Sequence, residues 1–312
     1  MSGSPPLADC WFLTGPTAGG KTAVGLELAE MLGAELLSLD SMALYRRLDI
    51  GTAKPTAAER RRVPHHLLDL VDASEEFSLA QYVAAAEQTA QAVRARQREV
   101  LLVGGTPLYL KALLRGIFEG PPADWQFRRH WQRQAELYGG EWLHQRVAEI
   151  DAAAAKRLHA RDTRRLIRAL EVFEKTGRPI SQWQRQFERA RPAEQCRVFV
   201  LDWPREQLAA RIDCRVDAMF AAGLVEEVRA LVAEGVVFGR TAGQALGYRE
   251  VLAHLRGESS LPETVELVKT RTRQFAKRQL TWFRSLSECR WAPMAEGFDP
   301  RSVAAQIAST RS

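Results

Sequence analysis

The sequence predicts an α/β fold in which a parallel sheet flanked by helices carries an all-helical insertion. Three observations lead to this prediction. Short, nearly continuous apolar runs alternate with helical patterns over roughly the first third of the chain, as is typical of parallel strands that are buried on both faces. Convincing strand patterns are absent between Phe118 and Glu194, where helical patterns dominate. A strand pattern then returns at Arg197–Leu201.

Apolar runs and turn signals place the first elements. The run Cys10–Thr14 predicts a strand, a glycine-rich turn follows it, and Lys21–Leu32 has the pattern of an amphipathic helix. Ser78 is a good N-cap residue, and Gln81 three positions later would complete a capping box, so we expect a helix from there to about residue 97. Further strands are expected at residues 34–39, 65–71 and 100–103.

The central region indicates an insertion into this α/β domain. Pro121-Pro122 and Arg191-Pro192 bracket it, and helices would begin at Asp124, Asp151 and Asp162. We therefore expect an α/β domain made of residues 1–117 and 195–312, and a helical insertion domain of residues 118–194. After Pro204, which is favoured in the first turn of a helix, the chain is expected to be mostly helical to its end.

Composition and charge exclude several classes of protein. The 312 residues are 46% hydrophobic and 26% charged, which rules out intrinsic disorder as the main state. No apolar run approaches the roughly 20 residues that span a bilayer, and Met1–Asp9 lacks the features of a secretory signal. The four cysteines have no spacing typical of a zinc site or a redox pair, so we expect reduced thiols in a cytoplasmic protein. The net charge of +6 permits a polyanionic partner without proving one.

A phosphate-binding motif occupies the turn after the first strand. Residues 15–22 fit the pattern G-x-x-x-x-G-K-[ST] between a predicted strand and a predicted helix, which is the context that the motif requires. Backbone N–H groups of such a loop point at phosphate oxygens, and the helix N-terminus adds positive potential. Lys21 supplies a point charge and Thr22 can hold Mg²⁺. The motif predicts a P-loop NTPase-like fold with a di- or triphosphate bound by Gly15, Pro16, Thr17, Ala18, Gly19, Gly20, Lys21 and Thr22.

The motif alone does not identify the reaction. A nucleotide kinase or NTPase usually has an acidic residue at the end of a later strand, whereas Val100–Val103 is followed by Gly104-Gly105-Thr106. The acidic residue stands earlier, at Asp40 after the second strand. These features count against a P-loop kinase or NTPase but leave it open, with Asp40 as a metal ligand.

Six further segments complete a pattern that covers most of the chain. They are Asp40–Pro55, Val63–Asp69, Val103–Leu110, Arg165–Glu171, Ala245–Glu250 and Thr272–Arg284. Together with the P-loop, this ordered set resembles the tRNA dimethylallyltransferases (tRNA isopentenyltransferases). No Cys/His cluster follows Trp291, which is similar to the shorter, bacterial type. The resemblance implies that dimethylallyl diphosphate donates its five-carbon group to N6 of adenine 37 of tRNA, and that diphosphate leaves.

The resemblance also implies roles for three residues of the reaction. Asp40 would be the general base that takes a proton from the amine. Its place at the carboxyl end of a strand, beside the P-loop, suits that role. Thr17 would donate a hydrogen bond to the bridging oxygen of the donor. Arg215 would face the diphosphate or guard the reaction channel. The P-loop with Mg²⁺ would stabilise the charge of the leaving group.

The surface that binds tRNA is expected in three places. On a helical wheel of Pro262–Leu286, a polar and basic stripe of Thr270, Arg273, Lys277, Thr281 and Arg284 lies opposite apolar residues that include Phe275 and Phe283. By resemblance, the insertion approaches the anticodon stem-loop and residues 244–249 line the pocket of the target base. The residues expected to bind tRNA are Asp40, Ser41, Met42, Ala43, Thr106, Arg128, Arg164, Arg165, Arg168, Gln244, Gly247, Arg249, Arg273 and Lys277.

One departure from the family pattern keeps a third function open. Ala43 stands where the family usually has Gln in D-S-x-Q, and an alanine side chain cannot hydrogen-bond a base edge. The leading hypothesis is a monomeric, Mg²⁺-dependent tRNA prenyltransferase. The alternatives are the P-loop kinase or NTPase already described and a non-catalytic paralogue that binds tRNA.

Overall fold

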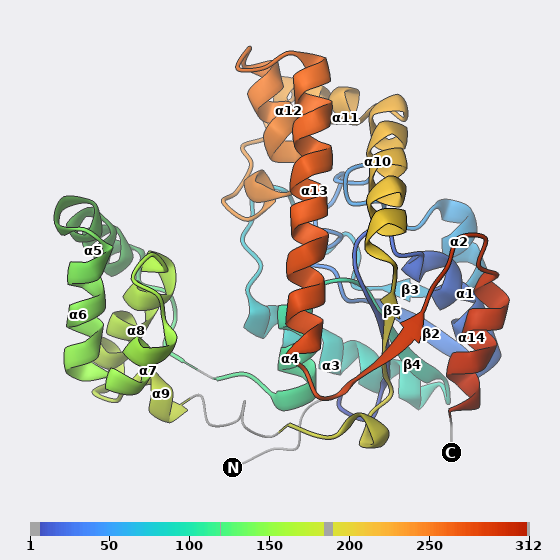
Figure 1. The fold of residues 1–312 in the computed structure, drawn as a ribbon, viewed down its shortest axis with the longest axis horizontal. Coiled ribbons are helices and arrows are strands. Elements are labelled where there is room, and N and C mark those ends of the chain that lie inside the picture. Colours follow the sequence, from blue (N-terminus) through green and yellow to red (C-terminus); the bar gives the residue numbers. More distant parts are fainter. Residues whose placement is uncertain (1–6, 119, 184–189, 311–312) are drawn as a thin grey trace. The chain divides into compact units, whose positions relative to one another are not determined.

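The chain forms two compact units in the computed structural model, which describes residues 7–118, 120–183 and 190–310 (Figure 1). One unit combines residues 1–114 with residues 190–312, and the other is formed by residues 115–189. The sequence analysis predicted an insertion of residues 118–194, so the bounds in the structure differ from the predicted ones by three and five residues. No helix among the described residues is both long and apolar enough to cross a bilayer.

The larger unit contains a six-stranded parallel sheet with the strand order β3-β2-β4-β1-β5-β6. This arrangement confirms the predicted fold class. Every connection between paired strands is a crossover, so the carboxyl ends of all strands meet at one edge of the sheet. The strands are β1 (Trp11–Thr14), β2 (Ala34–Ser38), β3 (His65–His66), β4 (Glu99–Val103), β5 (Val198–Asp202) and β6 (Cys289–Pro293).

Two expectations about strands were wrong. The third strand ends at His66 because the next residues leave the extended conformation: Leu67 and Asp69 have φ angles of 60° and 55°. The sequence analysis also missed β6 in a region that it expected to be mostly helical. Only Cys289 of β6 is buried, so this edge strand, paired with β5 alone, lacks the apolar run that marks the inner strands.

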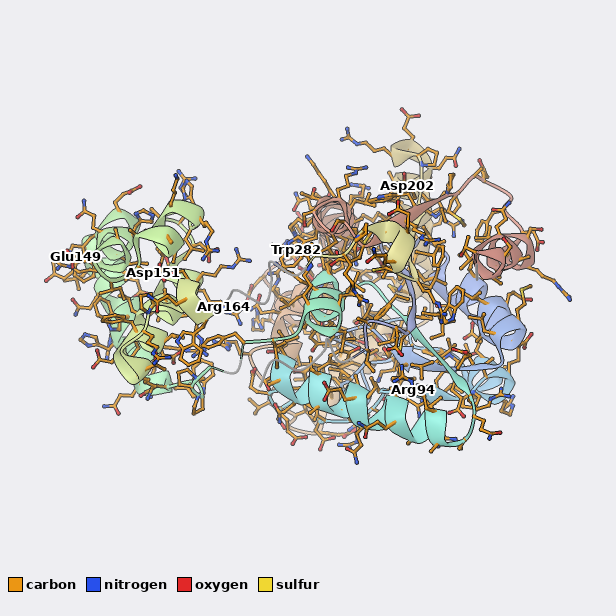
Figure 2. The ribbon with its side chains drawn as sticks, turned by 90° about the horizontal axis from the view of Figure 1, so that it is seen from below. Arg94, Glu149, Asp151, Arg164, Asp202 and Trp282 are labelled. Atoms are coloured by element: carbon orange, nitrogen blue, oxygen red, sulfur yellow. The ribbon has the colours of Figure 1, made fainter. Side chains whose placement is uncertain are left out.

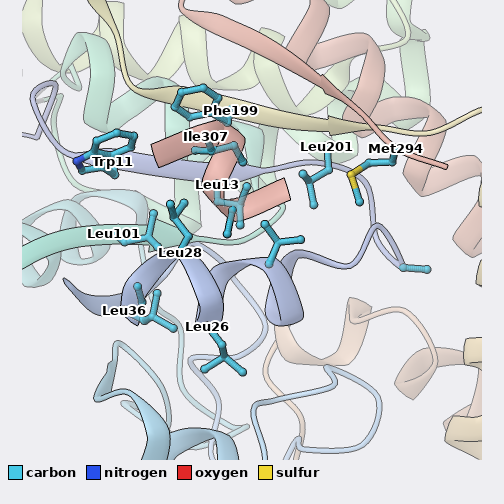
Figure 3. Packing of buried hydrophobic residues seen from close by; sticks show 14 of the residues in the cluster. Trp11, Leu13, Leu26, Leu28, Leu36, Leu101, Phe199, Leu201, Met294 and Ile307 are labelled. Carbon is cyan, nitrogen blue, oxygen red and sulfur yellow. The ribbon is translucent and has the colours of Figure 1, made fainter. Parts of the chain in front are cut away.

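A continuous apolar core holds the first helix against the sheet (Figure 3). Helix α1 (Lys21–Leu32) has the predicted bounds, and it packs extensively against α14 (Pro300–Ser309). Alternate strand residues such as Leu13, Leu36 and Leu101 belong to this cluster. Their neighbours on the other face of the sheet, among them Phe12, are equally buried, which explains why the strands are apolar throughout.

Among the remaining helices of this unit, α3 packs against β2 and β4. The predicted capping box of Ser78 and Gln81 is present at the start of α3. Helices α10 and α13 pack against each other, and α13 also contacts α12. The helices are α2 (Ala57–Arg62), α3 (Leu79–Ala95), α4 (Pro107–Arg115), α10 (Arg205–Ala221), α11 (Leu224–Ala233), α12 (Tyr248–Leu255) and α13 (Leu261–Arg284), with 3₁₀ turns at Ala193–Gln195 and Ala242–Gln244.

The described residues of the smaller unit form helices joined by loops, with no strand among them. Asp124, Asp151 and Asp162 accept backbone hydrogen bonds as N-caps, as predicted, and Asp151 (Figure 2) also accepts one from the N–H of Ser181 at 2.9 Å. The helices are α5 (Trp125–Tyr138), α6 (Gly140–Ile150), α7 (Ala152–Arg157), α8 (Thr163–Thr176) and α9 (Ile180–Trp183). Their buried faces, with Leu143, Val147 and Leu166 fully enclosed, form a separate hydrophobic core.

Candidate active site

A cavity of about 1050 Å³ opens at the carboxyl edge of the sheet in the larger unit. The P-loop after β1, the loop after β2, the loop after β4 and the first residue after β5 all border it, and α10 and α13 complete its wall. Ligands of parallel α/β sheets bind at this edge, because the loops and helix N-termini that follow the strands converge there.

Backbone geometry shapes the phosphate cradle. Gly15 and Gly20 have φ angles of 144° and 86°, and Cβ atoms there would lie 3.0 Å from the carbonyl oxygen of Leu201 and 2.8 Å from the ring of Phe298. Only glycine combines this conformation with this approach. Lys21 Nζ donates to the carbonyl oxygens of Gly15 at 3.1 Å and Pro16 at 2.7 Å, which holds the ammonium over the loop.

Three charged side chains line the cavity and influence one another electrostatically: Lys21, Asp40 and Arg215. Burial and the nearby Arg215 lower the pKa of Lys21 to about 7, against the opposite effect of Asp40. Burial lowers the pKa of Arg215 as well, and Asp40 again opposes the shift. The Nε of Arg215 is buried and has no hydrogen-bond partner among the described residues. Two cations that repel each other would be stabilised by a bound anion, so this arrangement suits a small polyanion.

Backbone amides hold the carboxylate of Asp40. Its Oδ1 accepts hydrogen bonds from the N–H groups of Met42 at 2.8 Å and Ala43 at 3.3 Å, and Ser41 N–H donates to Thr106 Oγ1 at 3.1 Å. The second oxygen of Asp40 makes no hydrogen bond among the described residues. Ala43 contributes its backbone N–H to this arrangement, which requires no particular side chain at position 43.

Sequence reasoning missed three residues that bind the cradle. Trp203 donates from Nε1 to the carbonyl of Gly19 at 2.9 Å, and Arg211 donates from Nε to the carbonyl of Ala18 at 2.9 Å while its guanidinium lies 4.2 Å from the Trp203 ring centroid. Gln279 binds the P-loop from α13. All three residues lie far from the P-loop in sequence. The only local signal was the position of Trp203 after a buried strand, where ligand-binding residues of parallel sheets are found.

The expected base-pocket residues also border the cavity. Arg249 donates to Gln244 Oε1 at 3.2 Å and to the buried carboxylate of Glu250, which also receives a hydrogen bond from Arg271. Gly247 N–H donates to the other oxygen of Glu250 at 2.8 Å. Glu250 therefore fixes the segment that carries the candidate contacts to the base. The candidates at this cavity are Ser41, Met42, Ala43, Thr106, Gln244, Gly247 and Arg249.

The basic stripe predicted on α13 does not border the cavity. Thr272, Phe275 and Gln279 line the cavity, whereas Arg273 and Lys277 lie about 100–160° away around the helix. Arg273 instead pairs with Asp213 of α10. Phe275 lies opposite the basic stripe, as predicted, and is 36% exposed at the cavity. Arg278, which the wheel did not single out, is the cation of this helix that reaches the cavity wall. Binding of tRNA by Arg273 and Lys277 stays a prediction.

The arginines expected to bind tRNA from the smaller unit divide into two pairs. Arg128 and Arg168 both donate to Glu171, whose side chain is fully buried, so much of their charge is compensated inside this unit. Arg165 is exposed and pairs with Asp162 of the same helix. Arg164 (Figure 2) is exposed and has no partner among the described residues. Arg164 is therefore the strongest of the four as a phosphate ligand, and all four roles stay predictions.

The sheet order and the glycine-rich loop define a P-loop α/β protein. A model of the IPP transferase family matches residues 43–286. The chain is 47% identical to the tRNA dimethylallyltransferase of Geobacter metallireducens, over 92% of this chain and 93% of that protein, and 45% identical to that of Desulforudis audaxviator, over 98% of each. The chain belongs to the IPP transferase family.

Solved structures of the family have the same fold. The full-length tRNA isopentenylpyrophosphate transferase from Bacillus halodurans is 36% identical and superposes with a TM-score of 0.70 over 96% of each chain. A eukaryotic dimethylallyltransferase captured acting on tRNA is 26% identical, with a TM-score of 0.76 over 96% of this chain and 77% of that one.

Proposed function

We propose that this protein transfers the dimethylallyl group of dimethylallyl diphosphate to N6 of adenine 37 in tRNA and releases diphosphate. The observation that carries the proposal is that Lys21, Arg215 and Asp40 line the same cavity and influence one another electrostatically. The cations suit the leaving diphosphate and the carboxylate suits an amine that must lose a proton. Membership of the IPP transferase family supports this reaction over others that a P-loop can host.

The proposed reaction divides the work between these groups. The bond between the allylic carbon and the bridging oxygen breaks, and the negative charge on diphosphate is stabilised by Lys21, Arg215 and the P-loop amides. The Thr17 hydroxyl donates a hydrogen bond to the oxygen that leaves. N6 of adenine forms the new bond to carbon, and Asp40 accepts the proton that N6 loses. Atoms and charges balance with diphosphate and the modified tRNA as products.

The residues present are suited to Mg²⁺ bound together with the donor. No three His, Cys, Asp or Glu side chains of the described residues are clustered closely enough to hold a metal alone. Mg²⁺ usually keeps several waters and binds substrate phosphates, so it needs few ligands from the protein. Thr22, exposed at the cavity, would hold the ion. Mg²⁺ would add positive charge at the diphosphate.

The absence of an acidic residue after β4 counts against a kinase or NTPase. In those enzymes a carboxylate at the end of a later strand helps to hold the metal, whereas Val103 is followed by Gly104 and Gly105 here. A Cβ on Gly104 would lie 2.2 Å from the carbonyl oxygen of Leu39, so the two backbones lie too close together for any larger residue at position 104.

The proposed function is tested by incubating the protein with dimethylallyl diphosphate, Mg²⁺ and unmodified tRNA that carries adenine 37. Mass spectrometry of the intact tRNA should show the gain of one dimethylallyl group, and ATP should not be hydrolysed in the absence of tRNA. Unchanged tRNA mass with robust ATP turnover would identify a kinase or NTPase. Tight tRNA binding without transfer, unaltered by Asp40→Ala, would identify a non-catalytic paralogue.

The titration of Lys21 predicts how donor binding depends on pH. A lowered pKa means that Lys21 is cationic below about pH 7 and loses its charge above it. The KM for dimethylallyl diphosphate should therefore rise as the pH increases, by about fivefold between pH 7 and pH 8. Lys21→Arg stays cationic and should flatten this dependence. A wild-type KM that is constant from pH 6 to 8.5 would contradict the prediction.

Arg164 should contribute one phosphate contact to tRNA binding. Arg164→Ala is expected to weaken tRNA binding and to reduce the slope of log affinity against log salt by about 0.7–0.9, the value for one contact. KM for the donor should not change. Arg146→Ala is the matched control, because Arg146 is also an exposed arginine of the smaller unit but pairs with Glu149. Equal salt slopes for the wild type and Arg164→Ala would show that Arg164 binds no phosphate.

A further inference from the structure

One buried amide lies between the phosphate cradle and the loop that follows β4. Gln279 of α13 is only 3% exposed. Its Oε1 accepts a hydrogen bond from Thr17 N–H at 2.9 Å, and its Nε2 donates to the carbonyl oxygen of Gly105 at 2.6 Å. A single side chain from late in the sequence therefore connects two loops of the site through both ends of its amide.

Gly105 leaves the space that this amide occupies. A Cβ on Gly105 would lie 2.5 Å from Gln279 Nε2 and 3.5 Å from Lys21 Nζ. Atoms forced as close as 2.5 Å must move apart, so any side chain at position 105 would displace the amide. Since both atoms lie near this one point, at 2.5 and 3.5 Å, the Gln279 Nε2 is no more than 6.0 Å from the ammonium that is expected to bind the donor.

The Gly105 end of this connection continues to the loop of Asp40. Thr106 follows Gly105, and its N–H donates to the carbonyl of Leu39 at 3.1 Å. Its Oγ1 accepts from Ser41 N–H at 3.1 Å. Leu39 and Ser41 flank Asp40, so the loop after β4 holds both neighbours of the proposed base. The contacts of Gln279 thereby set the spacing between the cradle and that base.

We propose that Gln279 is a positioning residue for the transfer step, one that acts through Thr17. This inference rests on the proposed function. The N–H of Thr17 is bonded to Gln279 and is not available to a phosphate oxygen, so the bond orients Thr17 and not the donor. Fixing the backbone of Thr17 limits where its hydroxyl can reach. The hydroxyl is then already oriented to donate a hydrogen bond to the leaving oxygen before the reaction begins.

The first test removes both hydrogen bonds and keeps the shape of the side chain. Gln279→Met is expected to lower kcat for transfer about 30-fold, because a small misplacement of a catalytic group lowers the rate by about this factor. The KM values for donor and tRNA should stay within about threefold of the wild type. Gln274→Met is the matched control, because Gln274 is exposed on the same helix and does not border the cavity. Thermal unfolding of both variants must lie above the assay temperature. A kcat for Gln279→Met equal to that of the control would overturn the proposal.

A double-mutant cycle tests whether Gln279 acts through Thr17. Thr17→Ala removes the hydroxyl that Gln279 is proposed to orient. If the two act as one unit, adding Gln279→Met to Thr17→Ala should lower kcat by less than about threefold further. A full and independent 30-fold loss in the double variant would contradict action through Thr17.

A pH profile separates hydrogen bonding from packing. The carboxylate of Gln279→Glu can accept from Thr17 N–H but cannot donate to Gly105, and its charge would oppose the donor diphosphate. A protonated carboxyl can do both, as the amide does. The ratio of variant to wild-type kcat should therefore rise as the pH is lowered from 8 to 6. A ratio that is constant with pH would argue against a role for the two hydrogen bonds of Gln279.

Hydrogen exchange gives a readout that does not depend on the reaction. The Thr17 amide should exchange faster in Gln279→Met than in Gln274→Met, because its acceptor is lost. If the wild-type protein transfers nothing to tRNA, the proposed function fails. The exchange measurement still shows whether Gln279 holds the Thr17 amide. Equal protection of Thr17 in both variants would show that no such bond holds the loop.

Discussion

Replacing Asp40 by asparagine is expected to lower the single-turnover rate of dimethylallyl transfer by about 10²–10⁴, the contribution of a positioned general base. The amide oxygen of asparagine can still accept from Met42 and Ala43, so the loop should keep its conformation. Affinity for tRNA should be retained. Transfer is measured by mass spectrometry after rapid quenching, under excess enzyme and saturating donor.

The matched control for this prediction is Asp72→Asn. Asp72 is an exposed carboxylate of the same unit that pairs with Arg46 and does not border the cavity. Its replacement should leave transfer unchanged. Near-wild-type transfer by Asp40→Asn would show that N6 loses its proton to another group, and the role of Asp40 would have to be abandoned.

Replacing Glu171 by glutamine should destabilise the smaller unit by about 3 kcal/mol or more, because it leaves Arg128 and Arg168 without their buried counter-charge. Burial alone would raise the pKa of Glu171, but hydrogen bonds from the two arginines outweigh it and lower the pKa. The stabilisation is therefore present above the ordinary carboxyl pKa and is lost as the pH falls through the lowered value.

Thermal unfolding together with hydrogen exchange in α5 and α8 measures the effect of Glu171→Gln. Glu174→Gln on the exposed side of α8 is the control and should unfold like the wild type. KM for the donor should not change in either variant, because the cradle belongs to the other unit. If Glu171→Gln unfolds at the same temperature as the control, the buried ion pairs do not hold this unit together.

The sequence sufficed for elements whose signals are local. The bounds of α1, the capping box of α3 and the three aspartate N-caps of the insertion depend on residues within one or two turns. The inner strands were recognisable because burial on both faces requires apolar runs. The edge strand β6 lacks that requirement, and the positive φ angles after His66 leave no mark in the hydrophobic pattern.

The candidate site was only partly predictable for a related reason. Lys21, Thr22 and Asp40 follow strands and belong to motifs, so their convergence at one edge of the sheet could be inferred. Gln279 reaches the P-loop across 262 residues, and its amide lies on a side of α13 that the helical wheel counts as apolar. A wheel also cannot distinguish a free arginine from one, like Arg168, whose charge a buried glutamate compensates.

The position of the modification on tRNA tests the central proposal most directly. After incubation with dimethylallyl diphosphate and Mg²⁺, the tRNA is digested and its fragments are sequenced by tandem mass spectrometry. We expect the mass of one dimethylallyl group on the base of adenine 37, and none when Asp40→Asn replaces the wild type. A group found on another nucleotide, or tRNA that gains no mass with active-site residues intact, would contradict the proposed function.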